Sequence, residues 1–238
     1  MPHTGPIHLK PAAELAERVL LPGDPHRALA VAQALLDQPK MFNHHRGLWG
    51  YTGAAPDGEL LTVQSTGMGG PSTAIVIHEL AELGARTLIR IGTCGALVDG
   101  ELAIGDIVAV ERALPADGAS AALGARDEVA PDAALTEALR EACGGRAVTA
   151  VSSDLFYDER DEPLRDWLER GAKVVEMEAA TLFRFAEARG VRAGCVLGVA
   201  DIVGAERNRI GQEELAELGV RIGEVGFAAL ERAGSTAR

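Results

Sequence analysis

The sequence is poor in cysteine and contains no long apolar run. Its three cysteines, Cys94, Cys143 and Cys195, are odd in number and widely spaced, which argues against a disulfide framework or a zinc cluster. Such sparse use is typical of a reducing compartment, so we expect a cytoplasmic protein. No apolar run approaches the roughly 20 residues of a membrane span, and the amino terminus lacks a secretory signal pattern. We predict no membrane partner.

Basic residues are also scarce. Lys and Arg number 23 against 35 Asp and Glu among 238 residues, which gives a formal net charge of −12. General electrostatic attraction to nucleic acid is therefore excluded, and any anion must be bound by a local site. Aromatic residues make up 4% of the chain, whereas 47% of its residues are hydrophobic, enough for a sizeable core.

Short aliphatic and β-branched runs alternate with helical patterns along the chain. Most of these runs are apolar throughout and do not alternate between apolar and polar residues, as expected for strands covered on both faces. The order predicts an α/β fold, a three-layer α/β/α sandwich that forms a single domain over residues 1–238. The expected strands are 18–21, 60–65, 87–91, 106–110, 147–152 and 193–200, and the expected helices are 25–36, 72–83, 131–142, 176–189 and 212–230. Residues 114–129 are expected to form a loop.

Two carboxylates, Glu176 and Glu178, flank Met177 in an apolar stretch that is typical of the start of a buried helix. A buried carboxylate costs several kcal/mol unless it is hydrogen-bonded or neutralised, so one interpretation is a site for a donor-rich ligand such as a sugar. The alternative is a capping carboxylate with one solvated neighbour, which these residues alone favour.

Two segments offer positive charge and free backbone amides near strand ends. After the first strand, a glycine turn at Gly23 leads into a helix that carries Arg27 in its first turn, a geometry suited to an anion. The third strand contains Arg90 and continues into a turn of small residues that includes Thr93 and Gly95. An arginine cannot lose its charge, so a buried Arg90 requires an anion or a core carboxylate.

A glycine-rich junction at 65–72 permits close backbone approach to a ligand before Ser72 caps the next helix. It lacks the lysine of a P-loop and the full dinucleotide-binding spacing. We therefore expect no nicotinamide cofactor.

Asp201 follows the apolar run 193–200 directly, where burial favours the uncharged form of a carboxyl group and suits a general acid. The alternative is an aspartate that caps the next turn. Arg207 and Arg209 are close enough in sequence to assist it. Phe156 could stack on a planar base, although an aromatic residue in this setting is more often part of the core.

Taken in order, these segments resemble the nucleoside phosphorylase family whose members are hexamers, the bacterial purine nucleoside phosphorylases and uridine phosphorylases. The resemblance spans nearly the whole chain. It rests on six short motifs, at 22–25, 46–47, 67–69, 90–95, 153–157 and 175–180. It implies a central mixed sheet, a homo-oligomer that is a hexamer built as a trimer of dimers, and no cofactor, with inorganic phosphate as a co-substrate.

The resemblance also implies a role for each matching residue. Phosphate would be held by Gly23, Arg27, Arg90, Thr93 and Arg46, the last from a neighbouring subunit. The ribose would contact Met68, Met177, Glu178 and the neighbour's His8. The base would lie beside Gly95, Phe156, Glu176 and Asp201, with Asp201 donating a proton to purine N7, assisted by Arg207 or Arg209. This arrangement suits glycosidic cleavage, which leaves positive charge on the sugar and negative charge on the base.

We therefore predict phosphorolysis of purine nucleosides or deoxynucleosides to free base and pentose 1-phosphate. Asp201 matches the acid of the purine enzymes. The segment 158–163 lacks the glutamine with which uridine phosphorylases read uracil, although Asn208-Arg209 resembles that branch. Gly47 stands where those relatives carry a cation-binding carboxylate, so we expect no metal. The alternatives are a uridine phosphorylase, a nucleosidase that uses water, and an inactive nucleoside-binding protein.

Overall fold

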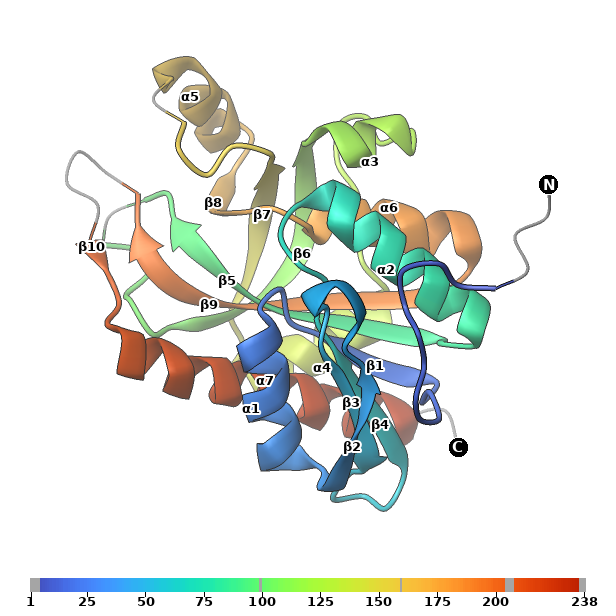
Figure 1. The fold of residues 1–238 in the computed structure, drawn as a ribbon. Coiled ribbons are helices and arrows are strands. Elements are labelled where there is room, and N and C mark those ends of the chain that lie inside the picture. Colours follow the sequence, from blue (N-terminus) through green and yellow to red (C-terminus); the bar gives the residue numbers. More distant parts are fainter. Residues whose placement is uncertain (1–4, 99, 159, 204–207, 236–238) are drawn as a thin grey trace.

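Two helical layers cover the two faces of a central sheet (Figure 1). The computed structural model describes residues 5–98, 100–158, 160–203 and 208–235. One face is covered by α1 (Pro25–Leu35), α4 (Ala133–Ala142) and α7 (Gln212–Ser235), and the other by α2 (Gly70–Leu83), α3 (Gly118–Ala122) and α6 (Ala179–Arg189). A further helix, α5 (Asp161–Glu169), lies against β8. The predicted three-layer α/β fold is confirmed.

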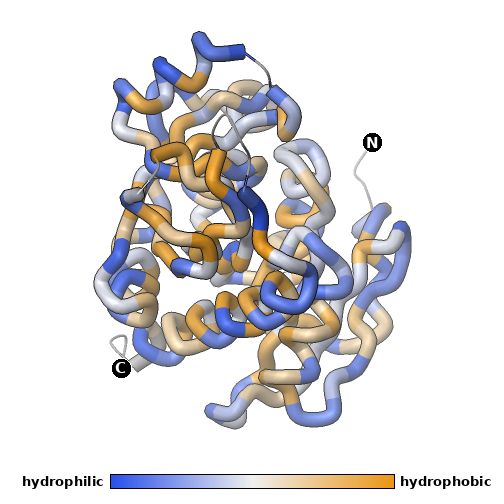
Figure 2. The backbone as a smooth tube through the Cα atoms, turned by 90° about the vertical axis from the view of Figure 1, so that its left-hand side faces the viewer, coloured by the Kyte–Doolittle hydropathy of each residue, from blue (hydrophilic) through white to orange (hydrophobic). Residues whose placement is uncertain are grey.

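The strands form one mixed sheet with the order β10-β9-β6-β7-β8-β5-β1-β4-β3-β2. In chain order they are β1 (Arg18–Leu21), β2 (Asp37–Asn43), β3 (Gly50–Ala54), β4 (Leu60–Gln64), β5 (Thr87–Ala96), β6 (Ile107–Ala116), β7 (Ala147–Ser153), β8 (Ala172–Glu176), β9 (Arg192–Ile202) and β10 (Asn208–Arg209). The backbone is mostly hydrophobic in the middle of the molecule, and hydrophilic segments are frequent along its outline (Figure 2).

Part of this sheet closes on itself. β5 pairs in parallel with β1 and with β9, and its last residues also pair in antiparallel fashion with β8. The strands β5, β9, β6, β7 and β8 therefore form a ring. As a result Gly95 lies opposite Val175 of β8 and Asp201 of β9. The ring thus brings three distant segments of the chain together at its rim.

The predicted turn after residue 91 is wrong. β5 continues through Ala96, and its partner β9 continues past the predicted end at residue 200 to Ile202. Thr93 and its neighbours pair with β9, so this segment is part of the sheet. Glycine is needed at these positions because neighbouring side chains occupy the space that a Cβ on Gly92 or Gly95 would fill.

Further predictions about elements need correction. α2 begins at Gly70, so Ser72 lies inside that helix and does not cap it. Glu176 ends β8 instead of beginning a helix, and α6 begins at Ala179. The segment 114–129 contains the end of β6 and the short helix α3. The sequence patterns also failed to indicate β2, β3, β8, β10 and α5. The exposed, charged composition of β2 and α5 hid them from a search for apolar periodicity.

Candidate active site

Arg90 of β5 is a buried cation held by two carboxylates. Its Nε donates to Oε2 of Glu176 at 2.9 Å, and its Nη2 pairs with Oε2 of Glu178 at 2.5 Å. Burial opposes the charge, but the two carboxylates outweigh it, so the pKa of Arg90 lies above its usual range. Its Nη1 makes no hydrogen bond to any residue that the structure describes. Core carboxylates therefore hold this arginine and leave one donor group unused.

Glu176 connects Arg90 to the start of α6. One carboxylate oxygen accepts a hydrogen bond from the hydroxyl of Ser152, and the carboxylate also accepts from the amides of Glu178 at 2.8 Å and Ala179 at 3.0 Å. These amides lie at the helix start, where backbone N–H groups lack partners within the helix. The capping interpretation thus applies to Glu176, whose two oxygens both face donors of the protein.

Glu178 turns the other way, although it occupies the N-cap position of α6. Its Oε1 accepts from the amide of Gly69 at 2.6 Å, while its Oε2 meets Arg90. Burial raises its pKa, and the charge of Arg90 works against that shift. Glu178 therefore joins the glycine-rich junction before α2 to the sheet. Met177 lies half-buried between the two glutamates.

Arg27 approaches this cluster from α1. Burial lowers the pKa of its guanidinium, Asp24 opposes that shift, and the nearby charges of Arg90 and Glu178 act on it in opposite directions. None of the described residues forms a hydrogen bond or an ion pair within bonding distance with its side chain. Arg27 is therefore a half-buried cation whose donors remain available, which is the condition for binding an anion.

The loops after β1 and β4 touch each other beside Arg27. The amide of Thr66 donates to the carbonyl of Pro22 at 2.9 Å, and a Cβ on Gly23 would lie 3.1 Å from the carbonyl oxygen of Gly67. Asp24 caps α1 by accepting from the amide of His26 at 2.9 Å. The backbone around Gly23 is thus fixed at the start of α1, as the anion-site interpretation requires.

Asp201 lies in β9 and is 3% exposed. A Cβ on Gly95 would lie 2.6 Å from its Oδ1, so its carboxyl group covers that glycine. Cys94, the neighbour of Gly95, senses the charges of Glu176, Asp201 and Arg90, and burial raises the pKa of its thiol. β5 therefore contributes Arg90 to one side of the cluster, and its Gly95 lies opposite Asp201 of β9 on the other side.

Arg209 lies next to Asp201 because β10 pairs with the end of β9. Its guanidinium carbon is 5.9 Å from the centre of the Phe156 ring, a distance typical of a cation–π contact. Phe156 itself is 41% exposed, so it is not a core residue. Arg207, the other predicted assistant, lies outside the described residues.

The remaining predicted residues occupy the surface or lie half-buried. Arg46 is exposed and has a φ of 58°, a left-handed conformation that is uncommon for a residue with a side chain. Met68 is 83% exposed, and Thr93 is half-buried. Arg46 and Met68 therefore have side chains accessible to a neighbouring molecule.

The N-terminal segment is anchored by Glu79 of α2. Its carboxylate accepts from the amides of Ile7 and His8 at 3.0 Å and of Leu9 at 2.7 Å, and it lies 2.8 Å from Nδ1 of His8. Burial opposes the charge of Glu79, but the three amides outweigh it and lower its pKa. Glu79 thus fixes the position of His8, whose side chain remains 29% exposed.

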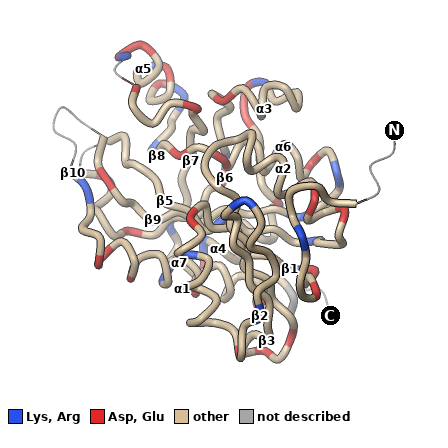
Figure 3. Tube along the Cα trace, viewed as in Figure 1, with Lys and Arg blue, Asp and Glu red and all other residues tan. Residues whose placement is uncertain are grey.

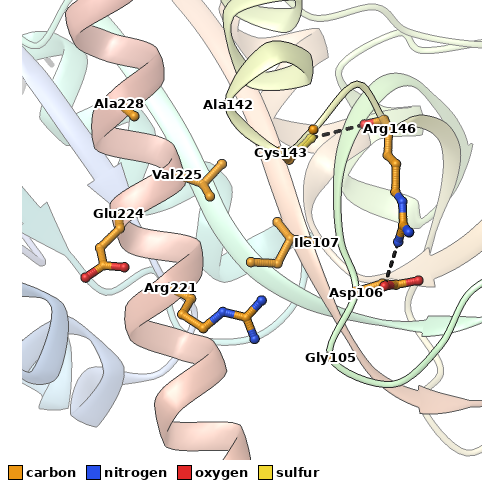
Figure 4. Close-up of a pocket in the computed structure, with 11 residues that line it drawn as sticks. Gly105, Asp106, Ile107, Ala142, Cys143, Arg146, Arg221, Glu224, Val225 and Ala228 are labelled. Atoms are coloured by element: carbon orange, nitrogen blue, oxygen red, sulfur yellow. Dashed lines mark hydrogen bonds and ion pairs between the residues drawn. The ribbon is translucent and has the colours of Figure 1, made fainter.

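A surface hollow of about 630 Å³ lies away from this cluster, between α7 and the start of β6 (Figure 4). An ion pair of 2.5 Å joins Arg146 and Asp106 at its wall, and none of the predicted site residues lines it. Acidic and basic residues are scattered over the molecule in the view of Figure 3. The buried charges, and not this hollow, identify the candidate site.

Two residues of the site were missed in the sequence. They are Ser152 and Glu79, which supply hydrogen bonds to Glu176 and to the N-terminal segment. Glu79 could have been noticed because it interrupts the apolar stretch of α2. Ser152 carries no such signal.

Among the described residues, no group of three or more His, Cys, Asp or Glu could hold a metal ion. No helix in the described part of the chain is long and apolar enough to cross a membrane.

Comparison with known proteins agrees with the fold. A family model described as "Phosphorylase superfamily" matches residues 17–231. The chain is 37% identical over 204 residues to a DeoD-type purine nucleoside phosphorylase of Jannaschia sp. (strain CCS1), covering 82% of this chain and 86% of the relative. It is 36% identical over 204 residues to a uridine phosphorylase of Salmonella typhimurium, covering 77% and 79%.

A guanosine phosphorylase of Halorubrum lacusprofundi is 35% identical over 212 residues, covering 86% of this chain and 87% of the relative. The chain belongs to the phosphorylase superfamily. The resemblance to nucleoside phosphorylases that its motifs indicate is confirmed.

The two arginines of the site should differ in their effect on stability. Arg90→Met leaves two buried carboxylates without their cation, so we expect a loss of about 3 to 5 kcal/mol in the free energy of unfolding. Arg27→Met keeps the packing stem and removes a charge that has no hydrogen-bonded partner, so stability should stay near that of the wild type. Urea unfolding measures both. Equal losses in the two variants would contradict this assignment.

The anchoring of residues 7–9 should depend on pH. The folded-state pKa of Glu79 is lowered, so its stabilising effect is present above the ordinary glutamate pKa of about 4.3 and is lost as pH falls through the lower folded value. Hydrogen exchange of the Leu9 amide should be slow at pH 7 and fast in Glu79→Gln, with Glu82→Gln as the control in the same helix. Equal exchange in all three proteins would refute the anchor.

Proposed function

We propose that the protein catalyses phosphorolysis of purine nucleosides, in which inorganic phosphate replaces the base and yields a pentose 1-phosphate. The observation that carries this proposal is Arg27, a half-buried cation without a hydrogen-bonded partner in the described structure, beside the Arg90–Glu178 pair. A nucleosidase that uses water would have no evident need for this second arginine.

Phosphate is bound in this proposal by charge and by backbone amides. Arg27 donates its guanidinium N–H groups, Arg90 donates from Nη1, and the backbone at Gly23 contributes at the start of α1. Thr93 adds a hydroxyl from β5.

The sugar is bound between the phosphate and the glycine-rich junction. Glu178 accepts hydrogen bonds from the ribose hydroxyls, since its carboxylate is fixed by Arg90 and by the Gly69 amide. Met68 and Met177 supply apolar contacts. The proposed contact of Glu176 with the base or sugar competes with its hydrogen bonds to Ser152, Arg90 and α6, so its main contribution is to orient Arg90.

In the reaction, the bond between C1′ and the purine nitrogen breaks while a phosphate oxygen forms a bond to C1′. Negative charge moves onto the base, and Asp201 in its acid form gives its proton to N7 of the departing purine. Arg209 lies beside Asp201 and over Phe156, where it can orient the acid and the base. Gly95 leaves room for this carboxyl group.

The proposed active site is shared between subunits of a homo-oligomer, a hexamer built as a trimer of dimers. Arg46 supplies a further positive charge to the neighbour's phosphate, and His8 reaches the neighbour's ribose. Their side chains are accessible, and Glu79 fixes the segment that carries His8. The proposal includes a cytoplasmic setting, phosphate as a co-substrate, and no metal or cofactor.

A uridine phosphorylase is the second candidate, supported by the similarity to the Salmonella typhimurium enzyme and by the Asn208-Arg209 segment. The buried Asp201 favours the purine reaction because a uracil leaving group has no N7 to accept its proton.

The proposed function is tested by base release from adenosine, inosine, guanosine and uridine, each with and without phosphate. We expect release of adenine, hypoxanthine or guanine only when phosphate is present, with pentose 1-phosphate as the second product. Release of uracil alone would support the second candidate. Turnover that does not require phosphate would refute the phosphorylase assignment.

Asp201→Asn separates acid catalysis from phosphate binding. Because the amide cannot give up a proton as the acid does, kcat for purine nucleosides should fall about 10² to 10⁴-fold while the Kd for phosphate changes little. Arg27→Met should do the reverse, raising the KM for phosphate more than it lowers kcat. Full activity of Asp201→Asn on every purine nucleoside would remove Asp201 from the mechanism.

A further inference from the structure

Two glycines of α7 form the surface on which α1 packs. A Cβ on Gly219 would lie 3.0 Å from Nε, 3.2 Å from Cγ and 3.3 Å from Cδ of Arg27. A Cβ on Gly223 would lie 2.7 Å from Cγ1 and 2.8 Å from Cγ2 of Val31. Both pairs are four residues apart in their helices, so one row of α1 side chains lies along a glycine groove of α7.

Gly219 has no other evident role in its helix. A glycine inside a helix is less favourable than alanine by roughly 0.5 to 1 kcal/mol. Gly219 is buried, and the nearest atoms around its missing side chain all belong to Arg27. The space that this glycine leaves is thus filled by the stem of one arginine.

Packing matters more for Arg27 than for Arg90. Arg90 also folds over a glycine, since a Cβ on Gly92 would lie 2.7 Å from its Cζ, but two carboxylates fix its guanidinium. Arg27 has no hydrogen bond to a described residue that could fix its direction. Its orientation therefore depends on the surfaces that hold its stem.

We propose that Gly219 is a positioning residue for phosphate, which acts by holding the stem of Arg27 against the backbone of α7. This inference rests on the proposed function for the identity of the anion. A methyl group at position 219 shifts the stem by a few tenths of an ångström and misplaces the guanidinium. Because a bound phosphate needs its donors at hydrogen-bonding distance, such a shift weakens phosphate binding without touching the acid or the sugar site.

Gly219→Ala tests the proposal through a split between kinetic parameters. We expect the KM for phosphate to rise about tenfold, within the range of coupling between contacting residues, while the KM for the nucleoside at saturating phosphate and the kcat stay near the wild-type values. Thermal unfolding should show a folded protein, because the flexible arginine stem can yield to contacts of 3.0 to 3.3 Å and alanine favours the helix.

The matched control is Gly223→Ala combined with Val31→Ala. Here the added methyl group takes space vacated by the valine methyl groups in the same helix contact, so the KM for phosphate should remain within about twofold of the wild type. A rise equal to that of Gly219→Ala would assign the effect to helix spacing and overturn the role of Gly219.

A double-mutant cycle with Arg27 decides whether Gly219 acts through that residue. In an Arg27→Ala background, Gly219→Ala should leave the KM for phosphate unchanged, because the stem it would displace is absent. An additional tenfold rise in that background, or no rise in the single variant, overturns the inference while the phosphorylase function stands. Phosphate-independent turnover of the wild-type protein would refute both the phosphorylase function and the role of Gly219.

Discussion

The contact of one buried arginine with two carboxylates organises this protein. Arg90 on β5 binds Glu176 at the end of β8 and Glu178 at the start of α6, and each glutamate extends the network further. Glu176 satisfies the first amides of α6, and Glu178 fixes the junction before α2 through Gly69. Neither the arginine nor the carboxylates could remain buried without the other, so these ion pairs link the sheet, the helix and the loop.

The protein holds the two arginines of the site in different ways. Arg90 is bound by the protein on two sides and can offer a ligand only its remaining nitrogen, whereas Arg27 is held by packing alone. The site therefore combines a rigid cation, whose removal threatens the fold, with an available one, whose removal threatens binding. The second type carries the functional argument because no described residue binds its guanidinium through a hydrogen bond or an ion pair.

The sequence predicted the layers, most of the apolar elements and the residues of the charged cluster. It showed that a buried Arg90 needs a negatively charged partner, but it did not decide between a ligand and a core carboxylate. A linear pattern does not show that Glu176 and Glu178 lie beside Arg90. The prediction of a turn at 92–96 was wrong because glycine is common in turns. Here the glycines belong to a strand and leave space for the side chains of Arg90 and Asp201. Ser152 and Glu79 were missed because their partners are distant in sequence.

The closed ring of strands has a consequence for how the molecule forms. Thr87 of β5 pairs with Arg192 of β9, more than a hundred residues away, and the intervening chain supplies the three other strands of the ring. Such a closure joins segments at large sequence separation, which is the slow part of folding for sheet proteins. Gly95 and Asp201 meet only in that pairing, so a ribosome must release nearly the entire chain before the acid can take its place.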